Sequence, residues 1–417
     1  MPNREITIRM YNVGFGDAFL VTLPMPQGER RLLFDCGSIA KGPSSIGEVA
    51  NQIVADCTNG SADPRIDVVV ATHRHRDHVS GFALPLWNSV DVGEVWLPWT
   101  EDPTNPEARR IRDAQAGLTN ALTAALAATG TLLTGMAADA EGPAVRLDPL
   151  AELAFNALSN EPAMRMLHSG FKGSPRKRFL PEVDKQTGKS VRSFVSEALP
   201  GVTVHVLGPS RSEEVIRDMD PPSGKSYLRL REERKLPTDM ATEPFGGEFA
   251  VASVPPSFSE DFKPEEIEQL EKGFDLSDFD AAVALDKAVN GTSLMLVLEI
   301  GGKYLLFPGD AQWGTWEAVL NDAEWRDLLK RTTFYKVGHH GSHNATPIDF
   351  VEHTIGHDVV AMVSTIERSI WPNIPREPLL EALIRQKAKI ARSDREDDLD
   401  AIFTVARPHC IETRIRL

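Results

Sequence analysis

The chain has 417 residues, 41% of them hydrophobic and 25% charged, which is ordinary for a globular protein that buries a large core. No apolar run approaches the roughly 20 residues that span a bilayer, and the N-terminus lacks the features of a secretion signal. The net charge of -15 argues against a generally basic nucleic-acid-binding surface, and three cysteines without C-x-x-C spacing indicate neither a disulfide framework nor a thiolate zinc site. We therefore expect a soluble, cytoplasmic protein without a membrane segment, in which histidine and carboxylate side chains hold any metal.

The first half of the chain predicts strands followed by helices. Runs that suit short strands occupy residues 6–10, 19–23, 32–34 and 66–71. From residue 103 to about 138 an Ala- and Leu-rich stretch predicts helices, while residues 139–198 carry no clear periodic pattern. We expect the strands to form one side of a sheet sandwich.

The second half returns to strands after a long polar segment. Residues 202–207 predict one strand, and residues 210–280 are polar and charged. Two strands at 294–300 and 303–307 flank Gly301-Gly302 in a hairpin pattern. The other expected elements are helices at 264–272 and 377–389, strands at 334–337 and 359–364, and two short strands at the C-terminus.

The strongest chemical signal follows the apolar run that ends at residue 71. Four potential metal ligands, His73, His75, Asp77 and His78, occur within six residues. A turn that leaves the end of a strand can fold such a segment around a metal ion, and neutral imidazole with carboxylate suits zinc, manganese or iron. The alternative is a solvated loop that happens to be rich in histidine, arginine and aspartate.

The pattern His73-x-His75-x-Asp77-His78 resembles the signature of the metallo-β-lactamase superfamily, and further motifs occur in the order expected for it. They are Gly14-Phe15-Gly16-Asp17-Ala18 and Phe34-Asp35-Cys36-Gly37 before the signature, and Asn290-Gly291-Thr292-Ser293, Phe307-Pro308-Gly309-Asp310 and Val337-Gly338-His339-His340-Gly341-Ser342 after it. The set looks most like the soluble metallo-β-lactamase-like domain of bacterial DNA-uptake competence channel proteins. The resemblance covers residues 4–100 and 200–395.

The resemblance implies an α+β fold, namely a four-layer αβ/βα metallo-β-lactamase sandwich with helical insertions. The active site would lie at one edge, between the two sheets. We expect residues 1–417 to form a single domain, with a mainly helical insertion at about 101–200 and a polar, charged insertion at about 210–285.

The resemblance also implies two divalent metal ions, with zinc preferred and manganese as the alternative. His73 and His75 would hold one ion, Asp77 and His78 would hold the other, and Asp310 would bridge them. The candidate metal ligands are therefore His73, His75, Asp77, His78, Asp310, His339 and His340, and the candidate catalytic residues are Asp77, His340 and His343.

The sequence gives independent support to Asp310 and places three histidines after the next strand. Gly309 lets the backbone turn beyond the apolar strand and present the Asp310 carboxylate, although a turn-capping aspartate is the alternative. We expect one of His339 and His340, preferably His340, to bind the second metal and the other to act near the substrate. His343 is either a proton donor or phosphate contact, or a surface histidine.

One histidine that the superfamily usually supplies between the signature and the bridging aspartate has no clear counterpart. Only His168 and His205 lie in that interval. His205 sits in an apolar strand, where a core or edge histidine is the better interpretation, and His168 lies in the unassigned insertion. Two histidines and Asp310 would then hold the first metal, unless another ligand completes it.

Several other residues have alternative interpretations. Asp17 either caps the tight turn made by Gly14 and Gly16, which could face an anion, or belongs to a structural loop. The resemblance implies that Asp35 supports the metal loop by hydrogen bonding, and we expect Cys36 to be a small buried filler. Arg176-Lys177-Arg178 is interpreted as a solvated basic loop rather than a polyanion contact, and 394–400 as a solvated turn.

Two adjacent metal ions can activate a shared water, so we expect a metal-dependent hydrolase with a dinuclear site and a bridging hydroxide. By the resemblance, the substrate is a phosphodiester or another small anionic compound, with nucleic acid among the candidates, and a partner protein is left open. One alternative keeps the metals but changes the substrate to a lactone, thioester or β-lactam. Another is a non-catalytic binding or regulatory protein with a degenerate metal site, which the lack of the intermediate histidine supports.

Overall fold

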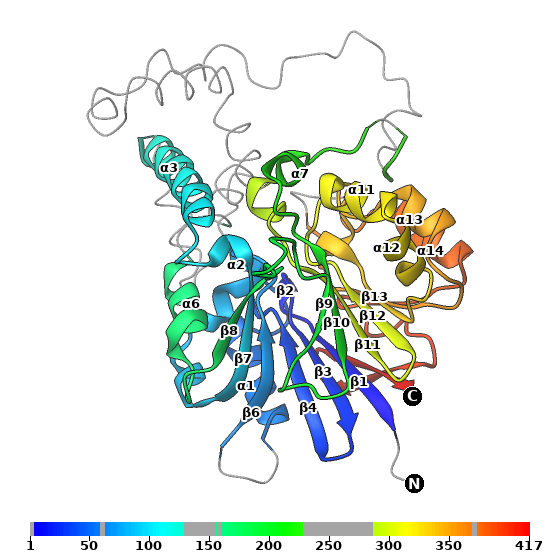
Figure 1. The fold of residues 1–417 in the computed structure, drawn as a ribbon. Helices are drawn as coiled ribbons and strands as arrows, with labels where there is room; N and C mark the ends of the chain where they lie inside the picture. The colour runs from blue at the N-terminus through cyan, green and yellow to red at the C-terminus, as the bar shows by residue number, and fades with distance from the viewer. Residues whose placement is uncertain are drawn as a thin grey trace, which may run out of the picture.

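The structure is a computed structural model that describes residues 4–58, 63–128, 156, 160–222, 224–227, 287–368 and 373–417. Two large sheets and several helices make it a mixed α and β protein (Figure 1). The first sheet contains, in spatial order, β16 (Phe403–Arg407), β17 (Cys410–Arg416), β1 (Glu5–Tyr11), β3 (Phe19–Met25), β4 (Gly28–Phe34), β6 (Arg65–Val70), β7 (Asp91–Pro98) and β8 (Arg176–Leu180). The second contains β15 (Lys389–Arg392), β14 (Val360–Val363), β13 (Phe334–Lys336), β12 (Lys303–Phe307), β11 (Met295–Ile300), β10 (Thr203–Gly208) and β9 (Ser193–Val195).

The strands that precede the sequence motifs are parallel to their neighbours. In the first sheet β4, β6 and β7 run parallel, and in the second sheet β12, β13 and β14 do so. The carboxyl ends of parallel strands open at the same edge of a sheet, so the motif loops emerge together. A two-stranded ribbon of β2 (Gly14–Phe15) and β5 (Ala40–Lys41) carries the first glycine-rich motif.

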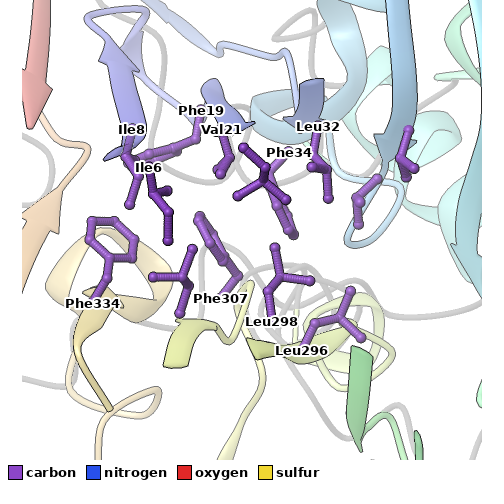
Figure 2. Packing of buried hydrophobic residues seen from close by; sticks show 14 of the residues in the cluster. Ile6, Ile8, Phe19, Val21, Leu32, Phe34, Leu296, Leu298, Phe307 and Phe334 are labelled. Carbon is purple, nitrogen blue, oxygen red and sulfur yellow. The ribbon is translucent and has the colours of Figure 1, made fainter. Parts of the chain in front are cut away.

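The two sheets share one apolar core, and Figure 2 shows side chains from both sheets pointing toward one another. Ile6 and Phe34 project from the first sheet, and Leu298 and Phe307 project from the second. The rings of Phe34 and Phe307 stack with centroids 3.9 Å apart and planes 6° apart. Replacing such a buried ring with alanine costs about 3–5 kcal/mol, so this contact helps to hold the sheets together.

Helices cover the outer face of each sheet. Val49 and Ile53 of α1 pack in one cluster with Val69 of β6, and Trp316 of α11 packs in another with Val297 of β11. Both faces of β11 are therefore buried, which explains the apolar run at 295–298. The helices are α1 (Ile46–Asp56), α2 (Arg76–Val79), α3 (Pro106–Ala128), α6 (Glu161–Arg165), α7 (Glu213–Arg217), α11 (Trp313–Asn321), α12 (Ala323–Leu329), α13 (Ile348–His353) and α14 (Glu377–Arg385). Within the described ranges, no helix has both the length and the apolar character needed to cross a membrane.

The structure confirms most of the predicted strands. The runs at 6–10, 19–23, 32–34 and 66–71 correspond to β1, β3, β4 and β6, and the later runs correspond to β10 to β14. The Gly301-Gly302 hairpin joins β11 and β12, whose residues pair in antiparallel register. The two short strands expected at the C-terminus are β16 and β17.

The helix predicted at 377–389 is too long. It ends at Arg385, and Lys387 adopts a left-handed backbone conformation with φ of 61°. The Ala388 N–H then donates to the Leu383 carbonyl at 3.0 Å, which closes the helix as a C-terminal cap. Lys389 therefore begins β15 instead of continuing the helix.

The interval 101–200 is not helical throughout. It contains α3 and α6, but β8 extends the first sheet and β9 extends the second, so both sheets take an edge strand from it. The basic triplet at 176–178 is part of β8 and not a solvated loop, because Arg178 is buried and pairs with Glu94 at 3.1 Å. Most of the polar segment at 210–285, including the helix predicted at 264–272, lies outside the described residues.

Candidate metal centre

The sequence motifs meet where strands of both sheets end. The loop with His73, His75, Asp77 and His78 follows β6, Asp310 follows β12, and His340 follows β13. These six residues are at most 2% exposed. Their potential ligand atoms form two groups, each with all its atoms within 4.8 Å of one another. The His73 group contains His73, His75 and Asp77, and the His78 group contains Asp77, His78, Asp310 and His340. We refer to these two candidate sets together as the metal groups.

Close backbone packing holds the signature loop in place. The Asp17 N–H donates to the Asp77 carbonyl at 2.9 Å, and the Cys36 N–H donates to the His78 carbonyl at 2.8 Å. Gly37 lies so close to the loop that a Cβ atom there would be 2.5 Å from the Arg76 oxygen and the His78 nitrogen. Glycine at position 37 therefore allows the loop to approach the end of β4.

Gly309 allows the backbone to turn just before Asp310. Its φ is +56°, and a Cβ atom there would lie 3.0 Å from the Leu294 carbonyl oxygen and from Thr72 Cβ. Only glycine takes this conformation without strain, so Asp310 can turn toward the signature loop.

The His73 group contains imidazoles that are neutral at neutral pH. His73 Nε2 lies 3.0 Å from His75 Nδ1 and 4.0 Å from Asp310 Oδ2. Burial, reinforced by the neighbouring His78, lowers the pKa of His73 well below its usual range. Burial also lowers the pKa of His75, to about 4. Neutral imidazole is the form that binds a metal, so these two rings are ready to act as ligands.

The His78 group has a different arrangement, in which imidazole nitrogens face carboxylates. His340 Nδ1 donates to the Ser364 carbonyl at 2.9 Å, so its Nε2 faces Asp77 Oδ2 at 3.2 Å. His78 Nδ1 donates to Asp35 Oδ2 at 2.8 Å, and its Nε2 faces Asp310 Oδ2 at 3.1 Å. Since each Nδ1 already carries a proton, a second proton or a cation must lie between each Nε2 and its carboxylate.

The charges of the His78 group are strongly coupled. Burial disfavours the charged form of every member, but the carboxylates Asp310 and Asp77 outweigh it and raise the pKa of His78 well above its usual range. His78 in turn holds the pKa of Asp310 and of Asp77 below the usual range, despite their burial. The Oδ1 atoms of Asp77 and Asp310 are buried and accept no hydrogen bond within the described part of the chain. Buried carboxylate oxygens without donors are suited to binding a cation.

Asp35 supports the centre as predicted. Its carboxylate accepts hydrogen bonds from the Thr72 N–H and Oγ1, each at 2.8 Å, as well as from His78 Nδ1. This fixes the His78 ring so that Nε2 points to the metal groups. Cys36 is fully buried, which agrees with its predicted role as a small filler.

Lys336 and the role of Asp17 were not anticipated from the sequence. Asp17 is not a turn cap, because its buried carboxylate forms an ion pair with the ammonium of Lys336. The Lys336 Nζ atom also lies 3.7 Å from Asp310 Oδ1. Burial would lower the pKa of Lys336, but Asp17 and Asp310 outweigh it and raise that pKa. One sequence feature could have indicated a buried charge here, namely the lysine that ends the otherwise apolar strand β13.

Two asparagines from the segment before β8 also hold the signature loop. Asn156 Oδ1 accepts a hydrogen bond from the Asp77 N–H at 3.1 Å, and Asn160 Nδ2 donates to the Arg74 carbonyl. Arg74 itself pairs with Glu101, with Nε and Oε1 3.0 Å apart. Part of the predicted insertion therefore packs directly against the candidate site.

The remaining loop histidines lie at the border of the centre. His339 Nε2 lies 3.8 Å from Asp310 Oδ2, and its Nδ1 lies 3.2 Å from Asn344 Oδ1. His339 is partly exposed, whereas His340 is fully buried within the His78 group. His343 is half-buried, and burial together with the nearby Arg376 lowers its pKa to about 4.

Neither of the two intermediate histidines joins the metal groups. His205 Nε2 lies 2.8 Å from Glu299 Oε2, and its strand β10 is paired on both sides, so it is a histidine of the sheet and not a metal ligand. The ring of His168 stacks on Phe179 with centroids 5.9 Å apart. Among the described residues, the His73 group thus contains two histidines and no third.

No protein-family model matches the chain, and no curated protein matches it either. The chemistry of the centre is therefore argued from its own residues. They form a buried set of imidazole and carboxylate ligands, with Asp77 common to both groups and Asp310 facing both. Nitrogen and oxygen ligands of this kind suit zinc or manganese.

Proposed function

We propose that this protein is a metal-dependent hydrolase with a dinuclear site. We further propose that its fold is the four-layer αβ/βα sandwich of the metallo-β-lactamase superfamily. Two sheets with a common core and helices on their outer faces support the fold. The arrangement of His78 and His340 is the main support for the metal site, because each ring donates through Nδ1 and directs Nε2 at a carboxylate.

The residues are suited to hold two cations side by side. His78 and His340 would hold one ion with Asp77, and His73 and His75 would hold the other. Asp310 Oδ2 lies 3.1 Å from His78 Nε2 and 4.0 Å from His73 Nε2, which supports its role as the bridging ligand. Two bound divalent cations supply Lewis acidity, which lowers the pKa of a shared water and stabilises negative charge on the attacked group.

The chain's own residues orient these ligands. Asp35 fixes the ring of His78, and the Ser364 carbonyl fixes the ring of His340. The ammonium of Lys336 lies near Asp310 Oδ1 and balances part of the negative charge of that carboxylate. His343 is neutral at neutral pH because of its lowered pKa, so we assign it a hydrogen bond to the substrate rather than proton donation. The leading substrate class is a phosphodiester.

Hydrolysis of bis-p-nitrophenyl phosphate in added zinc or manganese tests the proposal. We expect metal-dependent turnover by the full chain, and we expect His73→Ala and Asp310→Ala to reduce it to the buffer background. His205→Ala is the matched control, since this histidine pairs with Glu299 away from the metal groups and its loss should leave turnover unchanged. Circular dichroism checks that each variant is folded. Turnover that persists in a folded Asp310→Ala variant would contradict the proposal.

The two alternatives have distinct signatures in the same experiment. A protein that binds metal but leaves phosphodiesters intact would be tested next on lactones, thioesters and β-lactams. A protein that binds no metal would be a non-catalytic binding or regulatory protein, which the two-histidine composition of the His73 group favours.

A further inference from the structure

Arg376 lies beside the loop that carries the second set of histidines. It is the N-cap of α14, and its N–H donates to the Gly341 carbonyl at 3.0 Å. The preceding Pro375 packs so closely that a Cβ atom on Gly341 would lie 2.7 Å from Pro375 Cβ. Arg376 is therefore fixed next to Gly341, whose neighbour His340 belongs to the His78 group.

The guanidinium of Arg376 has no counter-charge within the described ranges. The residue is half-buried, and its Nε atom is inaccessible to solvent without a hydrogen-bond partner there. Burial alone lowers its pKa, with no carboxylate acting against it. By contrast, Arg74 and Arg178 do have such a partner, in Glu101 and Glu94 respectively.

His343 adds a neutral hydrogen-bond donor to this side of the centre. Arg376, His339 and Lys287 all lie close enough for their charges to affect its ring. The Lys287 ammonium is neutralised by Asp220 at 2.6 Å, so of these two cations Arg376 is the one without an ion-pair partner among the described residues. A partly buried cation without an anion is unfavourable until an external anion pairs with it.

We propose that Arg376 and His343 form a subsite for a phosphate oxygen of the substrate, beside the metal groups. A guanidinium binds phosphate through parallel N–H donors, and the His343 ring supplies a further donor. The subsite would select anionic phosphodiesters over neutral lactones and thioesters. This inference rests on the proposed hydrolase function for its biological meaning, but phosphate binding and metal binding are measured separately.

Isothermal titration of the metal-loaded full chain with inorganic phosphate tests the subsite, after unbound metal has been removed by desalting. We expect Arg376→Met to weaken phosphate binding roughly tenfold to hundredfold, as for the loss of a charge-assisted hydrogen bond. Arg376→Lys should give an intermediate affinity because it keeps the charge but not the planar fork. Arg385→Met is the matched control, since it removes the same charge from the exposed far end of α14. It should bind phosphate like the wild type.

Metal content, measured on the same samples, separates the two proposals. If the chain holds metal and Arg376→Met binds phosphate as tightly as the wild type, the subsite is wrong and the metal centre stands. If phosphate binding depends on Arg376 in a chain that holds no metal, the subsite stands and the proposed hydrolase function fails. A wild-type protein that binds no phosphate would also overturn the subsite.

Discussion

Replacing Lys336 by methionine tests the buried ion pair that Lys336 forms with Asp17 beside the metal groups. The side chain of Lys336 is 4% exposed, and those of Asp17 and Asp310 are 1% exposed. Methionine has a similar length but leaves Asp17 buried without its counter-charge. Breaking a buried ion pair by removing one partner costs about 3–5 kcal/mol, so we expect the free energy of unfolding of the metal-free protein to fall by about that amount.

Urea unfolding of metal-free Lys336→Met, Asp17→Asn and the double variant measures this effect. Because the double variant removes both charges of the pair, its loss should be smaller than the sum of the two single losses by at least about 1–2 kcal/mol. Lys330→Met is the control, since Lys330 and Asp327 form an exposed pair whose charges are screened by solvent, so its loss should leave the free energy of unfolding almost unchanged. Strictly additive losses, or a Lys336→Met variant as stable as the control, would refute the argument.

Two further predictions concern metal loading. Zinc binding to the metal-free protein at neutral pH should release protons, because carboxylates raise the pKa of His78 and His340 despite burial, and both rings must lose a proton to bind metal. Calorimetric titration in two buffers of different ionisation enthalpy measures the release, and equal heats would contradict it. Gly37→Ala should weaken zinc affinity at least about tenfold, because its Cβ atom would push the signature loop away from Asp310. Competition with a chelating dye measures the zinc affinity. Gly47→Ala is the control, because its Cβ atom meets nothing closer than 4.0 Å. Equal zinc affinity in the two variants would show that the close packing at Gly37 is unimportant.

The sequence predicted the parts of the site that are local in the chain. Each motif places its polar residues directly after a buried apolar strand, as with Asp35 after β4 and Asp310 after β12. Parallel strands bring such residues to a common edge, but the set of candidate ligands was predicted from the resemblance to the metallo-β-lactamase superfamily, and the local pattern supported the cluster at 73–78 and Asp310. The support of the signature loop by Asp35 was predicted from the same resemblance, and its hydrogen bond with His78 agrees with it.

The elements that were not predicted depend on contacts between distant parts of the chain. Asp17 and Lys336 pair across the two sheets, and neither residue has a local pattern that reveals the other. The short edge strands β8 and β9 pair on one side with a long strand, so they need little apolar alternation of their own. The end of α14 depends on the left-handed conformation of Lys387, which the sequence does not signal as a glycine would.

Elemental analysis of the purified chain tests the central claim most directly. The protein is saturated with zinc or manganese, freed of unbound metal, and measured for metal per chain. A dinuclear centre predicts about two ions per chain in the wild type and a clear loss in folded His340→Ala and Asp310→Ala variants. A wild-type chain that retains no metal, or variants that retain as much as the wild type, would contradict the account.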